Sequence, residues 1–342
     1  MKSLKSTPVR QPAATAPVAP YAGQLIGERY RLKEWLESGA MGSVWRAEQV
    51  RLRSPAAVKF LDPALIEYPE MQERFLQEAR SAAAVQSAHV IQIFDYGREA
   101  GVPYIAMELL RGENLDARLA RRGLLTPREL NEIFSQVARG LGAAHALGVI
   151  HRDVKPGNIF IAREGKYEVT KLIDFGIAKV RENALRVSQI TGTAQGTVLG
   201  TPQYMSPEQL RGRSDVDYRT DLWALGIIAC ECLTGRHPFP GATIGDLSVQ
   251  ICTEQPPAPS TLGKVPAGFD AWFFKATSKD PLDRFESAAA ISDALTKILL
   301  APSERKPALL EMTRAIARRN WQELGRAWGA ASRRTLLLSS SV

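Results

Sequence analysis

"VIHRDVKPGNIFI", residues 149–161, sets a run of charged and polar side chains between apolar residues. Within it, Asp153 follows a His-Arg pair, and Asn158 stands five residues later. Taken alone, this run also fits a loop of polar turn residues. A second polar motif, Asp-Phe-Gly at 174–176, follows in "LIDFGIAK". Each motif is weak by itself, so their combination and order along the chain must decide the fold.

Two further segments complete the pattern. "AAVK" (56–59) lies upstream in a strand-like run, and "SPE" (206–208) lies downstream. In this order the four segments resemble the signature of the protein kinases, specifically the bacterial eukaryotic-like (Hanks-type) serine/threonine kinases, over about residues 30–299. The resemblance implies an α+β, bilobal protein-kinase fold. A small β-rich N-lobe with one main helix would span 28–110, and a larger, mostly α-helical C-lobe would span 111–299.

The net charge of +8 is concentrated at the two ends of the chain. Residues 1–27 carry three basic and no acidic side chains, and residues 303–342 carry eight basic and three acidic ones. A nucleic-acid-binding domain should show its basic stripe on the folded body, so no nucleic-acid partner is expected. The Pro/Ala-rich composition of 1–27 predicts a disordered tail, because it offers little apolar surface to bury.

Cysteine usage and hydropathy predict the compartment. Cys230, Cys232 and Cys252 show neither zinc-ligand spacing nor an even disulfide count. No segment reaches the roughly 18 uninterrupted apolar residues of a membrane helix. Lys2 and Lys5 are not followed by the apolar region of a secretory signal. A reducing, cytoplasmic location is therefore expected.

Hydrophobic periodicity predicts the elements of the N-lobe. A helix is expected over 69–85, with its apolar face at Met71, Phe75, Leu76, Ala79 and Ala83. Short, alternating, turn-bounded runs predict strands at 30–36, 43–50, 54–61, 90–97 and 102–110.

Helices dominate the rest of the predicted domain. Thr126 and Glu129 form a capping box with Pro127 at the first helical position, and Gly148 marks the end of that helix. The segment 221–235 is almost entirely apolar, which predicts a helix buried on every side.

The resemblance implies a role for each charged residue in the motifs, because phosphoryl transfer needs positioning and charge neutralisation. Lys59 would grip the α- and β-phosphates of ATP, and Glu78 would pair with Lys59. The nearby Glu73 is the alternative partner. Asp153 would accept or orient the proton of the substrate hydroxyl. Lys155 would neutralise the γ-phosphate during transfer.

The resemblance also implies the metal and nucleotide sites. Asn158 and Asp174 would hold Mg²⁺, with Mn²⁺ as a substitute, because hard cations prefer oxygen ligands. Adenine would lie between apolar walls, with Met107 as gatekeeper. The residues expected to bind ATP are Gly39, Gly42, Val44, Ala57, Lys59, Met107, Phe160 and the backbone of Glu108 and Leu110.

One residue departs from the family pattern. In "LESGAMGSVW" (36–45), Glu37 stands where the first glycine of the phosphate-binding loop belongs, while Gly39 and Gly42 are present. By itself this segment also fits a hairpin turn. We expect a working nucleotide loop, in which the Glu37 carboxylate lies near the ribose edge and turns toward water.

The segment between Asp174 and Glu208 has the length and glycine spacing of an activation loop. Thr197 and Thr193 are its expected phosphosites. In the family, Glu208 forms a buried ion pair with a distant arginine, and Arg284 in "KDPLDRFES" fits that role.

The family also places some motif residues in the core. His151 and Phe175 would pack between the lobes, and Asp221 would bind the backbone of the catalytic loop. The alternative for Asp221 is a helix N-cap.

These motifs predict a Mg-dependent kinase that transfers the γ-phosphate of ATP to Ser/Thr hydroxyls and autophosphorylates, through transient self-association. A pseudokinase scaffold and a small-molecule phosphotransferase are the alternatives. The basic tail 300–342 lies beyond the kinase pattern. Its segment 307–332 is either a solvated or packed helix, or an amphipathic helix for an anionic membrane or a partner.

Overall fold

The computed structural model describes residues 19–39, 42–175, 202–241 and 243–301. The expected phosphosites Thr193 and Thr197 lie outside the described residues, as does the segment 307–332. Within the described ranges, no helix has the length and apolar character needed to cross a bilayer.

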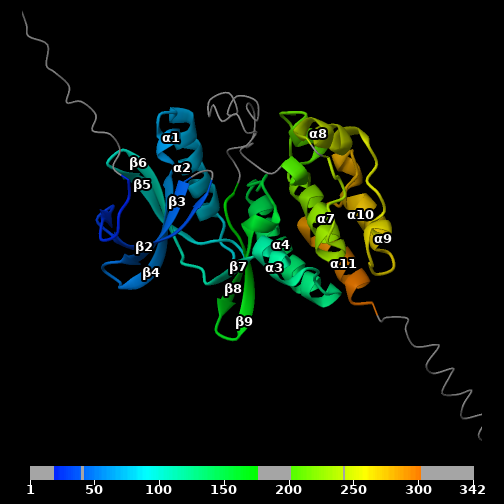
Figure 1. The fold of residues 1–342 in the computed structure, drawn as a ribbon, viewed down its shortest axis with the longest axis horizontal. Helices are drawn as coiled ribbons and strands as arrows, with labels where there is room; N and C mark the ends of the chain where they lie inside the picture. Colours follow the sequence, from blue (N-terminus) through cyan, green and yellow to red (C-terminus); the bar gives the residue numbers. More distant parts are fainter. Residues whose placement is uncertain (1–18, 40–41, 176–201, 242, 302–342) are drawn as a thin grey trace, which may run out of the picture. The chain divides into compact units, whose positions relative to one another are not determined.

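The N-lobe is built on an antiparallel sheet with the strand order β1-β2-β3-β4-β6-β5 (Figure 1). The predicted strands are confirmed in place, except that β6 ends at Met107 and not at Leu110, and β5 begins at Ile93 and not at Val90. Val90 instead forms an isolated parallel bridge with Leu172, so 90–92 connects this lobe to the next sheet. The prediction that the whole of 1–27 is a disordered tail was wrong at its end, because β1 pairs with β2 there and buries Ile26. The strands are β1 (Leu25–Ile26), β2 (Tyr30–Gly39), β3 (Gly42–Gln49), β4 (Ser54–Leu61), β5 (Ile93–Glu99) and β6 (Val102–Met107).

Helix α2 (Pro69–Ala84) covers this sheet and follows the short helix α1 (Pro63–Ile66). It packs against β5 and β6 through an apolar face that includes Phe75 and Leu76. The prediction for Ala83 was wrong, because Ala82 is the buried residue and Ala83 is exposed. Full burial of one such large side chain contributes about 1.5–3 kcal/mol, so this face fixes α2 on the sheet.

The C-lobe combines a small sheet with helices (Figure 1). The predicted capping box of Thr126 and Glu129 is present at the start of α4, and Gly148 follows the end of that helix with a φ of 71°. The sheet has the order β7 (Gly112–Asn114), β8 (Ile159–Glu164), β9 (Tyr167–Leu172). The helices are α3 (Leu115–Arg122), α4 (Pro127–Ala146), α6 (Pro207–Leu210), α7 (Arg219–Thr234), α8 (Ile244–Thr253), α9 (Pro259–Leu262), α10 (Phe269–Ala276) and α11 (Ala288–Leu299), and the short 3₁₀ turns are η1 (Pro156–Asn158), η3 (Pro202–Tyr204) and η4 (Pro281–Asp283).

Helix α7 is buried along almost its whole length, as its apolar sequence predicts. Gly226 lies so close to α10 that a Cβ would meet Ala276 and Thr277 at 2.9 Å. Cys230 and Cys232 are fully buried on this helix. Burial raises the pKa of the Cys230 thiol to about 12, so this cysteine packs as a small apolar side chain.

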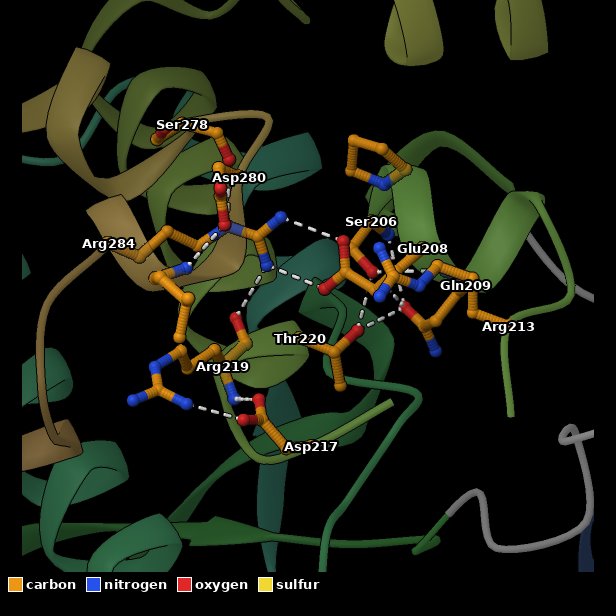
Figure 2. A network of polar contacts seen from close by, with 12 residues as sticks. Ser206, Glu208, Gln209, Arg213, Asp217, Arg219, Thr220, Ser278, Asp280 and Arg284 are labelled. Atoms are coloured by element: carbon orange, nitrogen blue, oxygen red, sulfur yellow. Dashed lines mark hydrogen bonds and ion pairs between the residues drawn. The ribbon is translucent and has the colours of Figure 1, made fainter. Parts of the chain in front are cut away.

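The expected ion pair between Glu208 and Arg284 is confirmed, and Figure 2 shows it at the centre of a polar network. Two parallel hydrogen bonds of 2.6 and 2.8 Å join the guanidinium to the carboxylate. Arg284 also donates to the backbone oxygens of Ser278 and Arg219. The Arg284 side chain is 0% exposed and the Glu208 side chain 5% exposed, so neither charge has water as an alternative partner.

Arg284→Ala should therefore destabilise the domain. Removal of one partner from such a buried pair typically costs about 3–5 kcal/mol, because the remaining charge is left uncompensated. Thermal melting of the variant should show a clear drop beside Arg111→Ala, which alters an exposed arginine. Equal melting temperatures for the two variants would contradict a stabilising role for the pair.

Candidate active site

The loop that carries Asp153, which is the predicted catalytic loop, is held by Asp221 at the start of α7. Its carboxylate accepts hydrogen bonds from the backbone N–H of His151 (3.0 Å) and of Arg152 (2.8 Å). The Nε2 of His145 lies 2.8 Å from the same carboxylate. The alternative role as a helix N-cap is wrong, because Tyr218 occupies the N-cap position of α7.

His151 and Phe175 are core residues, as expected. Both are fully buried, and their ring centroids are 4.5 Å apart. The His151 Nε2 lies 3.1 Å from the backbone oxygen of Ile173. Burial lowers the pKa of His151 more than the neighbouring acids raise it, so the ring packs in its neutral form.

Asp153 lies beside a lysine and an amide. Its Oδ2 is 3.0 Å from the Lys155 ammonium and 3.1 Å from the Asn158 Nδ2. The same Nδ2 donates to the Asp153 backbone oxygen at 2.8 Å. These bonds fix the direction of the Asp153 carboxylate, because a lysine and an amide reach it from within its own loop.

The Asn158 amide is oriented in a way that suits a cation. Because its nitrogen is directed at Asp153, its Oδ1 is turned to the other side. The Ile173 N–H donates to the Asn158 backbone oxygen at 3.0 Å, which brings Asn158 next to the residue preceding Asp174. An amide oxygen and a carboxylate are the hard ligands that a divalent magnesium ion prefers, so these two residues fit the metal that the resemblance implies.

Lys59 faces several carboxylates. Its side chain is 9% exposed, and its ammonium lies 2.7 Å from Asp174 Oδ1. Burial opposes the charge, but Asp174 and then Glu78 outweigh it and raise the pKa of Lys59. Glu78 is buried on α2, whereas Glu73 is exposed and pairs with two surface arginines. This placement favours Glu78 over Glu73 as the partner of Lys59.

The expected adenine-binding residues of the sheet share one face. Val44 is the cross-strand partner of Lys59, and Ala57 is the partner of Met107. Cross-strand partners project to the same side, and so do Ala57 and Lys59, which are two residues apart. A cavity of about 20 Å³ next to this face is lined by Lys59, Glu78, Ala79, Ala82, Ile91, Ile93, Ile105, Met107, Asp174 and Phe175.

The segment joining the lobes contains an ion pair that the motifs do not predict. The Glu108 carboxylate accepts from the Lys171 ammonium at 2.9 Å and from the Gln92 N–H at 2.8 Å. The Glu108 N–H donates to the Gln92 oxygen. Lys171 is buried, and its only sequence signal is its place in the strand before Asp-Phe-Gly. Of the other expected residues here, Leu110 is partly buried and Phe160 lies half-buried on β8.

The two glycines of the predicted phosphate-binding loop differ. Gly42 has a φ of 143°, and a Cβ there would overlap the Phe60 backbone oxygen. A Cβ on Gly39 would meet no atom of the described residues within 4 Å. Glu37 is exposed, as expected, but it pairs with Val44, so it lies on the same sheet face as Lys59. Its charge contributes to the raised pKa of Lys59.

Comparison with known proteins agrees with this geometry. The family described as "Protein kinase domain" matches residues 30–292. Serine/threonine-protein kinase Pkn1 of Myxococcus xanthus is 39% identical over 285 residues, which cover 82% of this chain and 40% of Pkn1. PknH of Mycobacterium tuberculosis is 38% identical over 283 residues, covering 82% and 44%. PknL of the same organism is 34% identical over 293 residues, covering 84% and 71%. The chain thus spans less than half the length of Pkn1 and PknH.

Solved structures show the same fold. The crystal structure of the Mycobacterium tuberculosis PknI kinase domain superposes with a TM-score of 0.65 at 27% sequence identity. The match covers 82% of this chain and 99% of the PknI chain. The chain therefore belongs to the protein kinase domain family, and its relatives place it among the bacterial Hanks-type serine/threonine kinases.

Proposed function

We propose that this chain transfers the γ-phosphate of ATP to serine or threonine hydroxyls of proteins, with Mg²⁺ as its metal. The observation that carries the proposal is the pairing of Lys59 with Asp174 at 2.7 Å, close to the cluster of Asp153, Lys155 and Asn158. Family membership supports the reaction class, since the relatives named above are serine/threonine-protein kinases.

Each charged residue has a distinct task in this proposal. Lys59, which pairs with Asp174 here, would hold phosphate oxygens of ATP, and Asp174 would hold the metal. Bound magnesium would neutralise the negative charge of the phosphate groups during transfer. Asp153 orients the acceptor hydroxyl and takes its proton, and Lys155, already 3.0 Å from Asp153, faces the transferred group. Asn158 holds Asp153 with its nitrogen, and its oxygen would hold the metal.

An assay with radiolabelled ATP, run with and without a generic protein acceptor, tests the proposal. Label on the acceptor protein supports a protein kinase. Label transferred only to small molecules would identify a small-molecule phosphotransferase. ATP that is neither bound nor consumed would make the chain a pseudokinase scaffold.

Asp153→Asn and Asp174→Asn should fail in different ways. Asp153→Asn should abolish nearly all transfer and spare ATP·Mg binding, because the residue acts on the hydroxyl proton. Asp174→Asn weakens a metal ligand, so high Mg²⁺ should relieve part of its defect. Transfer rates measured across a magnesium titration check this. Identical residual activity of both variants at every magnesium concentration would contradict the assignment.

Glu37 should weaken ATP binding only slightly. Two charges about 4 Å apart cost about 1 kcal/mol in water and about 4 near a protein surface. Because Glu37 is exposed, Glu37→Gly should lower the KM for ATP by no more than about tenfold, with kcat little changed. Gly39→Glu should raise the KM for ATP much more strongly. This loss would not come from misfolding, because a Cβ at Gly39 meets no atom of the described residues within 4 Å. If only Glu37→Gly binds and turns over ATP, the natural chain is inactive and the proposed function fails.

The loop preceding "SPE" should be autophosphorylated on Thr197 or Thr193. Arg152 is half-buried, its Nε has no hydrogen-bond partner within the described ranges, and burial lowers its pKa. A phosphate, which adds about −1.5 to −2 charges, would stabilise such a guanidinium. Mass spectrometry of the purified chain should find phosphate in this loop, and Asp153→Asn should lack it. Phosphate confined to the terminal tails would count against the idea.

A further inference from the structure

Gln209, the residue after "SPE", binds three parts of the C-lobe at once. Its Nε2 donates to the backbone oxygen of Arg152 at 2.8 Å. Its Oε1 accepts from the backbone N–H of Ser206 at 3.0 Å and from the Thr220 hydroxyl at 2.6 Å, and Figure 2 shows Gln209 between these two residues. The orientation of the amide is fixed at both ends, because the Ser206 N–H can only donate and the Arg152 carbonyl can only accept.

Arg152 needs such support. Its φ is 64°, in the left-handed region that non-glycine residues seldom adopt. A residue in this conformation persists only where its surroundings hold it. Asp221 holds the Arg152 N–H at 2.8 Å, and Gln209 holds the Arg152 carbonyl. The peptide unit held by Gln209 is the one that leads directly into Asp153.

We propose that Gln209 is a positioning residue for the proposed phosphotransfer. Its amide nitrogen holds the strained Arg152 backbone and thereby sets the direction of the Asp153 carboxylate. The inference rests on the proposed function, because the positioned group is the acceptor of the substrate proton. Misplacement of a reacting group by about 1 Å can lower the rate about a hundredfold. Loss of the hydrogen bond from Gln209 can therefore lower kcat even though Gln209 does not contact the substrate.

A second role of Gln209 has to be separated from this one. Gln209 is also the third residue of α6, where it completes a capping box with Ser206. Gln209→Glu makes the separation, because glutamate completes a capping box equally well. The same change replaces the donor that faces the Arg152 carbonyl with an oxygen that cannot donate. A loss seen in Gln209→Glu therefore reports the bond to Arg152 and not the cap.

The first measurement is steady-state kinetics of the full 342-residue chain. Gln209→Glu should lower kcat about tenfold or more and leave the KM for ATP within about twofold, since a misplaced Asp153 affects the chemical step. Gln136→Glu is the matched control. Gln136 accepts a hydrogen bond from the Thr170 N–H through its Oε1 at 2.7 Å, and glutamate keeps an oxygen acceptor at that position. Equal kcat for Gln209→Glu and the control, or a loss that appears only in KM, would overturn the proposal.

A double-mutant cycle with Arg152→Gly tests the mechanism. Glycine adopts a φ near 64° without strain, so its carbonyl does not need Gln209. Gln209→Glu should therefore cost about tenfold in the Arg152 background and less than about twofold in the Arg152→Gly background. Equal losses in the two backgrounds would show that Gln209 does not act through this backbone.

Hydrogen exchange supplies a readout that does not depend on activity. The Arg152 amide should exchange about tenfold faster in Gln209→Glu than in the parent chain, and should be unchanged in Gln136→Glu. If the parent chain transfers no phosphate to any acceptor, the proposed function fails, and exchange still decides the role of Gln209. Unchanged exchange at Arg152 would overturn that role even in an active enzyme.

Discussion

The loop that carries Asp153 depends on its hydrogen bonds to the buried carboxylate of Asp221. A buried carboxylate is costly unless it is hydrogen-bonded. Here two backbone N–H groups and the His145 ring compensate it, while the residue itself is 1% exposed. Because Asp221 belongs to α7, the loop takes its position from a helix that is buried along almost its whole length. This attachment holds the Arg152 N–H and so anchors the loop that carries Asp153.

Local sequence rules predicted most of the fold. The capping box at Thr126, the apolar α7 and the short alternating strands all express periodicity and cap chemistry, which act over a few residues. The errors lie where distant contacts decide. The sequence pattern predicted that 90–92 belongs to the N-lobe strand. In the structure this segment instead forms a bridge and a backbone hydrogen bond with Leu172 of β9. Ala83 fits a helical period as well as Ala82 does, and only the packing of α2 on the sheet separates them.

The candidate site divides in the same way. Motif order identifies Lys59, Asp153 and Asp174, and the structure brings Lys59 and Asp174 into contact although they are 115 residues apart. Lys171 and Gln209 carry no comparable signal, because their partners are set by tertiary structure. The motif requires glycine at both Gly39 and Gly42. Among the described residues, Gly42 lies against the backbone of Phe60, whereas Gly39 has no neighbour at the Cβ position. Spacing predicted residues that the structure brings together, and it did not predict the residues that support them.

The burial of α7 has a consequence for synthesis of the chain. Its apolar surface packs against α4, α9 and α10. A ribosome makes residues 219–234 after α4 and before α9 and α10, so part of this surface stays uncovered until α10 has been made. Expression fragments that stop before Ala276, the end of α10, would keep that part exposed and would tend to aggregate. A fragment that contains α7 therefore has to include α10 as well.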